Sequence, residues 1–82
     1  MPEKYSLPIA MIYMSSKRAK TLNAEKVLTL AEDILEHGQN VPIRVCVDRQ
    51  KYLLIDGLHR LLALHFLGEE EIDGFLVPTR LQ

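Results

Sequence analysis

A strand and a helix meet within the stretch Leu53-Leu54-Ile55-Asp56-Gly57-Leu58-His59-Arg60-Leu61-Leu62-Ala63-Leu64. The apolar run before Asp56-Gly57 is typical of a strand, and the run after it is typical of a helix that Gly68 ends. A helix start offers free backbone N–H groups and the positive end of the helix dipole. Because His59 and Arg60 add an imidazole and a guanidinium there, the stretch predicts an anion site, most simply for phosphate.

A purely structural role for His59 and Arg60 is an equal alternative from the residues alone. Arg60 could form an ion pair with Asp56 or with the acidic run 69–71, and His59 could hydrogen-bond to the backbone. Asp56 is a candidate general base or metal ligand, but an Asp before Gly at a helix start is more often a turn former or cap. We favour the turn or cap for Asp56.

Composition limits the class of protein. Eighty-two residues, nearly half of them hydrophobic, predict one domain over residues 1–82 with one core, in which residues 1–6 are a loose arm. The balance of 10 basic and 11 acidic residues argues against a DNA-coating surface. One cysteine, no signal-peptide pattern and no apolar run near the ~20 residues of a membrane span predict a cytoplasmic protein without a membrane partner.

The order of elements predicts an α+β fold, with a mixed sheet and two main helices in the order β-α-β-β-α-β. Strands are expected at 7–14, 41–48, 52–55 and 72–77, with a three-residue turn, 49–51, in the central hairpin. Helices are expected at 24–37, between Asn23 as N-cap and Gly38, and at 58–67. The first helix should bury one apolar stripe, made of Val27, Leu30, Ala31, Ile34 and Leu35.

Two further groups of polar residues precede this corner in the sequence. The loop 15–22 carries Lys17, Arg18 and Lys20, and it is either a solvated connector or a phosphate-binding loop. Lys26 and Thr29 are neighbours on one flank of the first helix, and from the residues alone they are surface residues. His37, His59 and His65 lie on separate helices or faces without a cysteine at ligand spacing, so no metal site is predicted.

Gly57-Leu58-His59-Arg60 resembles the Gly-Cys-His-Arg signature of sulfiredoxins, and it is similar to the Gly-Glu-Arg-Arg signature of ParB N-terminal domains. The segment 23–30 resembles the sulfiredoxin helix start Asp-Pro-x-Lys-Val-x-Ser-Leu, and the likeness covers roughly residues 7 to 80. The resemblance implies a small ParB/sulfiredoxin-like fold that binds ATP or ADP, with or without Mg²⁺. It implies that Lys26, Thr29, Gly57, Leu58, His59, Arg60 and Arg18 contact the nucleotide, with Lys17 and Lys20 in the basic loop beside it.

The sequence departs from both families at Leu58. Sulfiredoxin chemistry needs a thiolate at this position, so sulfiredoxin activity is not expected, and Cys46 is expected to be a buried, inert strand residue. ATP hydrolysis or phosphoryl transfer stays open. A DNA-binding or nuclease domain that uses Lys17, Arg18 and Lys20 is the alternative, although no helix-turn-helix follows in this sequence. A regulatory module for a partner protein is a weaker alternative, and the protein could be a monomer or a homodimer.

Overall fold

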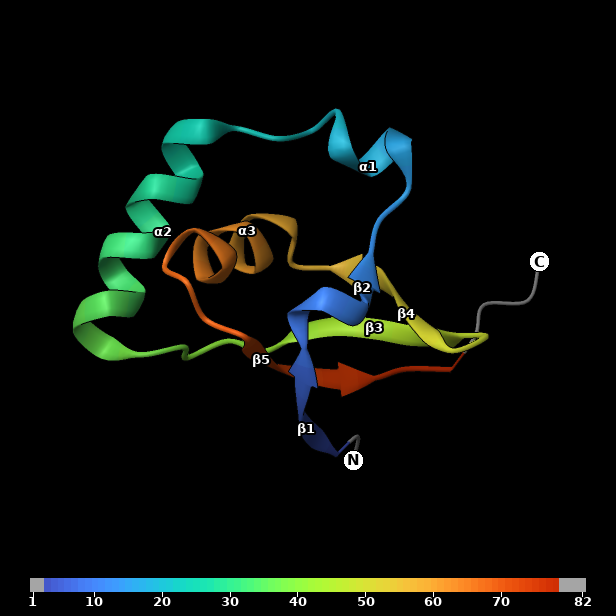
Figure 1. Cartoon of the computed structure of the whole chain (residues 1–82). Helices are drawn as coiled ribbons and strands as arrows, with labels where there is room; N and C mark the ends of the chain where they lie inside the picture. Colours follow the sequence, from blue (N-terminus) through green and yellow to red (C-terminus); the bar gives the residue numbers. More distant parts are fainter. Residues whose placement is uncertain (1–2, 79–82) are drawn as a thin grey trace.

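The fold is given by a computed structural model of the chain, which describes residues 3–78 (Figure 1). Helices and strands follow one another as β1 (Lys4–Pro8), the 3-10 helix η1 (Ile9–Met11), β2 (Ile12–Tyr13), α1 (Ser16–Ala19), α2 (Ala24–His37), β3 (Ile43–Asp48), β4 (Lys51–Asp56), α3 (Leu58–Phe66) and β5 (Glu71–Leu76). Figure 1 shows α1, α2 and α3 on the same side of the sheet. Within residues 3–78, no helix has the length and apolarity that a membrane span requires.

The five strands form one mixed sheet in the order β1-β5-β3-β4-β2. The pairs β1–β5 and β3–β4 are antiparallel, whereas β3–β5 and β2–β4 are parallel. An α+β fold with a mixed sheet is therefore confirmed. From α2 onward the predicted order of elements is also confirmed.

The N-terminal part differs from the prediction in two respects. Residues 4–6 are not a loose arm, because they belong to β1 and pair with β5. The single strand expected at 7–14 is wrong too: β1 and β2 lie at opposite edges of the sheet, joined by η1. Pro8 ends β1 because its nitrogen has no hydrogen to donate, and the Ile9 N–H instead bonds to the Glu70 carbonyl at 2.9 Å. Residues 1–2 of the predicted arm lie outside the described residues.

Helix α2 has the predicted bounds and the predicted caps. The Asn23 side chain accepts a hydrogen bond from the Lys26 N–H at 3.2 Å, and Gly38 ends the helix with φ of 78°. The buried stripe is narrower than predicted, since it holds Val27, Ala31 and Ile34, with Leu30 half-buried. Leu35 was assigned wrongly to this stripe. It is 75% exposed because one residue beyond Ile34 turns the side chain about 100° away from the core.

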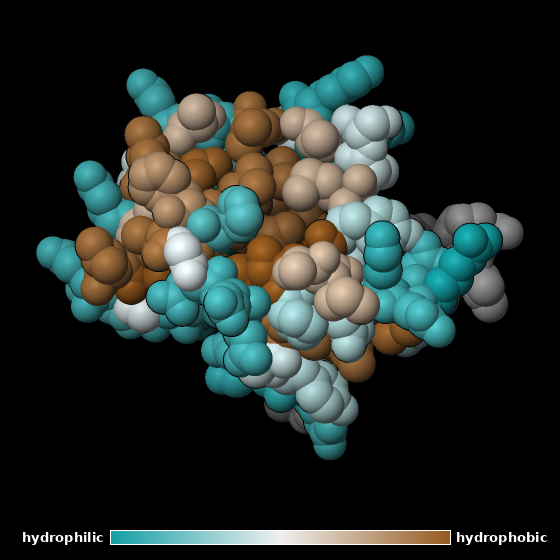
Figure 2. All heavy atoms as spheres, viewed as in Figure 1, coloured by the Kyte–Doolittle hydropathy of each residue, from teal (hydrophilic) through white to brown (hydrophobic). Residues whose placement is uncertain are grey.

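Helix α3 is packed between α2 and the sheet, with contacts to α2 and β3. Leu58, Leu61, Ala63 and Leu64 are buried and meet the sheet residues Ile43, Val45, Leu54 and Ile72 in one core. Phe66, the last residue of α3, is apolar but 64% exposed. Figure 2 shows brown, hydrophobic atoms gathered in the middle of the face drawn, over α3 and between α2 and β2.

The β3–β4 hairpin closes with two residues rather than the predicted three. Lys51 is already paired with Asp48, so the turn is Arg49-Gln50. Arg49 has φ of 60°, a left-handed conformation that costs side-chain-bearing residues free energy and glycine almost none. A two-residue hairpin selects this conformation because it matches the twist of the strands.

Replacing Arg49 by glycine is expected to relieve this strain and to raise the free energy of unfolding by about 0.5–1 kcal/mol. Urea unfolding followed by circular dichroism measures the change. Gln50→Gly is the matched control, because the described residues with positive φ do not include Gln50. If both variants change the stability equally, the strain at Arg49 is not what the substitution relieves.

Candidate functional site

A strand, a turn and a helix start form the corner predicted from the sequence. β4 ends at Asp56, Gly57 has φ of 109°, and α3 begins at Leu58. A Cβ at position 57 would lie 2.6 Å from Ile43 Cγ2 and 3.2 Å from Ile43 Cα, so only glycine brings α3 this close to β3. The local geometry therefore depends on this residue.

The start of α3 is open, in the sense that no side chain accepts hydrogen bonds from its first backbone N–H groups. Its first backbone hydrogen bond runs from the Leu61 N–H to the Gly57 carbonyl at 2.9 Å, and no side chain caps it. The N–H groups of Leu58, His59 and Arg60 therefore have no partner within the helix. Asp56 was predicted as a turn former or cap. The prediction of a cap is wrong, because Asp56 is the last residue of β4 and no side chain caps α3. The Asp56 carboxylate Oδ2 instead lies 3.7 Å from Arg44 Nη2.

A cavity of about 480 Å³ opens at this corner and collects side chains from α1, α2 and α3. Its lining contains all seven predicted nucleotide-binding residues together with Asp56, and two residues that were not predicted for the site, Thr21 and Leu30. The full lining is Arg18, Thr21, Lys26, Thr29, Leu30, Asp56, Gly57, Leu58, His59 and Arg60. The predicted residues therefore meet at one place, although they come from segments up to 42 positions apart in a chain of 82.

The basic loop divides into residues inside and outside this cavity. It contains the short helix α1, whose N-cap Ser15 accepts a hydrogen bond from the Arg18 N–H at 3.2 Å. Arg18 lines the cavity and is half-buried, whereas Lys17 and Lys20 are exposed and do not line it. Thr21 follows Arg18 by three residues and donates its hydroxyl to the Arg18 carbonyl at 2.7 Å. The hydroxyl-rich character of the loop was the available signal for Thr21.

His59 joins two walls of the cavity. The backbone N–H of Asn23, which caps α2, donates to His59 Nε2 at 3.0 Å. An imidazole nitrogen that accepts a hydrogen bond carries no proton, so this contact requires the neutral ring with its proton on Nδ1. His59 is thus bonded to the backbone, as the structural alternative predicted, and it holds the start of α2 against the start of α3.

Positive charge in the cavity comes from Arg18, Lys26 and Arg60. Asp56 is its one acidic lining residue, and that carboxylate already lies within ion-pair distance of Arg44. Among residues 3–78, no ion pair is formed by Arg60, so the predicted structural pairing with Asp56 or the acidic run is not found. Three cations therefore line the cavity at the start of α3, in a chain of net charge −1.

A second cavity of about 440 Å³ adjoins the first along α2. It shares Thr21, Lys26, Thr29 and His59 with the first cavity and adds Asn23 and Glu25. The Thr29 hydroxyl donates to the Glu25 carbonyl at 3.0 Å, so its oxygen remains able to accept a hydrogen bond. Together the two cavities have the extent of a small-molecule site.

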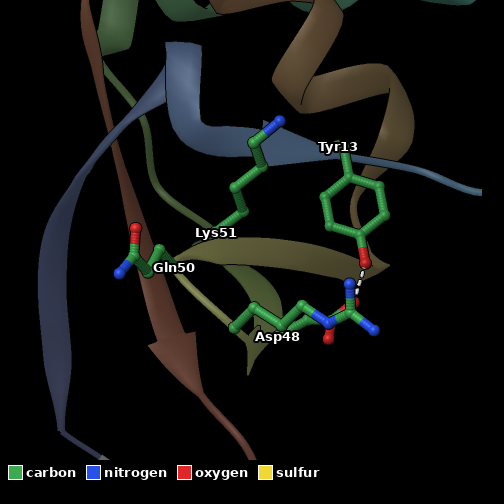
Figure 3. Close-up of a pocket in the computed structure, with 5 residues that line it drawn as sticks. Tyr13, Asp48, Gln50 and Lys51 are labelled. Carbon is green, nitrogen blue, oxygen red and sulfur yellow. Dashed lines mark hydrogen bonds between the residues drawn. The ribbon is translucent and has the colours of Figure 1, made fainter.

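A larger cavity, of about 700 Å³, lies away from this corner at the β3–β4 turn (Figure 3). Tyr13 reaches from β2 toward the turn and donates its hydroxyl to the Asp48 carboxylate, as Figure 3 shows. This hydrogen bond raises the pKa of Tyr13 above its usual value, with smaller contributions from burial and from the charge of Asp48. The cavity has no open helix start, and its hydrogen bond fixes the short edge strand β2 to the hairpin. Size alone therefore does not identify the functional site.

No group of three or more His, Cys, Asp or Glu residues between positions 3 and 78 is arranged to hold a metal ion. His37 contacts Asp33 at 3.1 Å on the exposed side of α2, and His59 bonds to Asn23. The charged residues that line the cavity at the start of α3 are thus three cations, Arg18, Lys26 and Arg60, and one carboxylate, Asp56.

The sequence matches the family model of the ParB N-terminal domain over residues 3–81. The chain belongs to the ParB N-terminal domain family. The resemblance to this family and its fold is confirmed. A comparison with curated proteins finds no match.

Solved structures agree with the family assignment. This ParB N-terminal domain is similar to sulfiredoxin from Arabidopsis thaliana, with 28% identity and a TM-score of 0.84 over 95% of this chain and 88% of that one. A truncated ParB from Caulobacter crescentus in complex with CTP-γ-S has 20% identity and a TM-score of 0.83 over 95% of this chain and 46% of that one. A free serine kinase in complex with AMP has 16% identity and a TM-score of 0.77 over 93% of this chain and 31% of that one. The domain therefore spans under half of the ParB chain and about a third of the kinase.

Proposed function

We propose that the domain binds a nucleotide, ATP or ADP in the first place, with its phosphates at the start of α3. The observation that carries this proposal is the open helix start facing a cavity lined by Arg18, Lys26 and Arg60. Backbone N–H groups, the helix dipole and fixed cations are the features that bind phosphate in proteins. The positive side chains would be unfavourable at a helix start without an anion.

Eight of the ten lining residues have a direct role in this proposal. The N–H groups of Leu58, His59 and Arg60 donate to phosphate oxygens, and the Arg60 guanidinium adds a two-pronged contact. Arg18 and Lys26 neutralise the remaining phosphate charge, and Thr21 and Thr29 face the adjoining cavity where the sugar would lie. His59 is a positioning residue in this proposal, because its bond to the Asn23 backbone orients α2. If Mg²⁺ accompanies the nucleotide, Asp56 is the lining residue whose oxygens suit it.

Relatives support the ligand class but leave the base open. The Caulobacter crescentus ParB was solved with CTP-γ-S and the serine kinase with AMP, so this fold accommodates a pyrimidine nucleotide in one protein and a purine nucleotide in another. Both share about a fifth of their residues or fewer with this domain, which is a likeness of fold. The preference for ATP or ADP thus rests on the resemblance of the residues 23–30 and 57–60 to the sulfiredoxin motifs.

Hydrolysis of the nucleotide, or transfer of its phosphate, would be a further activity beyond binding. Leu58 is 5% exposed and packs into the core at the position where the resemblance places the sulfiredoxin thiol. Cys46 is 4% exposed within β3 and does not line the cavity, so it cannot replace that thiol as a nucleophile. Asp56 remains the candidate base for hydrolysis or phosphoryl transfer. We propose binding as the primary function.

Thermal unfolding with added nucleotide tests this proposal. A ligand at about 100 times its Kd stabilises the native state by about 2.7 kcal/mol. A domain of this size gains about 4–8 °C in Tm for each kcal/mol. We expect ATP or ADP to raise the Tm more than AMP or CTP, with and without Mg²⁺. Absence of any shift with all four nucleotides at millimolar concentration would contradict the proposal.

The DNA-binding alternative uses Arg18, which lines the cavity, together with two basic residues outside it. Lys17 and Lys20 are exposed outside the cavity, where a nucleic-acid backbone could reach them. This alternative predicts binding that weakens steeply as salt rises. A gel shift with duplex DNA at low and at physiological salt, compared between the wild type and Lys17→Ala with Lys20→Ala, separates it from nucleotide binding.

A further inference from the structure

An apolar groove of about 590 Å³ lies between α3 and the segment that joins β1 to β2. One wall is formed by residues 8–14, including Ile9, Ile12 and Met14, and the other by Leu61 and Leu62 of α3. Figure 2 shows brown surface over α3 on this face, with teal atoms bordering it. The lining is completed by His65, Glu69 and Glu70.

This groove differs in position and in chemistry from the cavity of about 480 Å³ at the start of α3, called the phosphate cavity below because phosphate is proposed to bind there. The two share no lining residue, and they open on different turns of α3. The phosphate cavity contains three cations, whereas no Lys or Arg lines the groove. Glu69 and Glu70, with no cation beside them in the lining, would therefore repel a phosphate-bearing ligand from the groove.

The acidic residues of the groove carry uncompensated charge. Glu69 and Glu70 are exposed, and neither is in any ion pair of the described part of the chain. Apolar residues beside unpaired carboxylates favour an occupant with apolar side chains next to positive charges. The same carboxylates would repel an anionic lipid surface.

We propose that the groove docks a short segment of a partner protein, in which a few apolar side chains are flanked by Lys or Arg. The apolar side chains would be buried against Ile12, Met14 and Leu62, which are only half-buried in the free domain. The flanking cations would pair with Glu69 and Glu70. A short docked segment forms a weak, transient interface rather than a permanent one.

Fluorescence anisotropy with two labelled peptides tests this docking. Both peptides carry the same Leu-Ala-Leu-Leu core, and one has flanking lysines where the other has flanking glutamates. We expect the lysine peptide to bind on the order of tenfold more tightly at about 50 mM NaCl, and this difference to shrink at about 500 mM. Equal binding of the two peptides, or no binding of the lysine peptide, would overturn the proposal.

Variants of exposed residues test whether the peptide binds in the groove. Glu69→Lys combined with Glu70→Lys should reverse the peptide preference, while Ala10→Glu should weaken both peptides on the order of tenfold by placing a charge in the groove. Glu32→Lys with Glu36→Lys makes the same charge change on the exposed side of α2 and should leave the preference as it is. If the α2 variant reverses the preference, or if Ala10→Glu binds like the wild type, the peptide does not occupy the groove.

Two controls separate this proposal from others. All variants should keep the wild-type circular dichroism spectrum and the wild-type Tm shift with ATP or ADP, because none of these residues lines the phosphate cavity. Arg60→Ala should leave peptide binding unchanged, so a failure of nucleotide binding does not affect this test.

Light scattering should show a monomer at high concentration. A dimer that Ala10→Glu dissociates would mean that a second copy fills the groove, and it would overturn the proposal.

Discussion

Replacing Gly57 by alanine is expected to lower the free energy of unfolding by about 2–5 kcal/mol. Two effects add at this position. The backbone has φ of 109°, which an alanine adopts at a cost of about 1–2 kcal/mol. The new Cβ would also lie 2.6 Å from Ile43 Cγ2 and 3.2 Å from the Ile43 backbone, so a strand residue that is 1% exposed would have to move.

Urea unfolding of three alanine variants separates strain from overlap. Gly38 and Gly68 have φ of 78° and 82°, and a Cβ at either position meets no atom within 4 Å. Alanine at these positions should therefore show the backbone cost alone, and Gly57→Ala should be more destabilising by about 1–3 kcal/mol. Equal losses in all three variants would mean that α3 is not held against β3 by the glycine.

Replacing Arg60 by alanine is expected to weaken ATP or ADP binding about 10- to 100-fold, the effect of losing about 1.5–3 kcal/mol in hydrogen bonds to a charged group. Arg60 is half-buried, lines the cavity at the first turn of α3 and forms no ion pair within residues 3–78, so its removal takes away a ligand contact rather than a structural one. Isothermal titration calorimetry measures the Kd directly. Arg60→Lys should recover only part of the affinity, because an ammonium lacks the planar fork of the guanidinium.

Lys17→Ala is the matched control for this result. It removes the same charge from the chain, but Lys17 is exposed on α1 and does not line the cavity. We expect its Kd to stay within about twofold of the wild type, since an exposed charge outside the site is screened by salt. A loss in Lys17→Ala as large as that in Arg60→Ala would indicate general electrostatic attraction instead of a defined phosphate site.

Local signals in the sequence were sufficient for the centre of the fold. Asn23 and Gly38 determine the ends of α2 through a side-chain cap and a left-handed residue, and Asp56-Gly57 marks the corner where β4 becomes α3. Lys26 and Thr29 have the pattern of surface residues, and only the resemblance to the family motifs predicted them beside Arg60. The structure places all three in the lining of one cavity. These features depend on residues that are near one another in the sequence, or on a motif.

The errors arose where long-range pairing decides the structure. Residues 4–6 are polar and show no strand alternation, yet they pair with residues of β5 that lie 67 to 71 positions later. Leu35 has the hydrophobicity of a core residue, but α3 covers only the stripe through Val27, Ala31 and Ile34. The bond between His59 and the Asn23 backbone joins positions 36 apart, so no local pattern could assign the neutral ring.

The most direct measurement is an amide NMR titration of the domain with ATP or ADP. Phosphate at the helix start predicts the largest shifts for the N–H groups of Leu58, His59 and Arg60, with further shifts near Thr21 and Lys26, in a saturable manner. The amide signals of Arg49, Gln50 and Lys51, which line the larger cavity, should not shift. Shifts confined to residues 49–51, or none at saturating nucleotide, would contradict nucleotide binding at this corner.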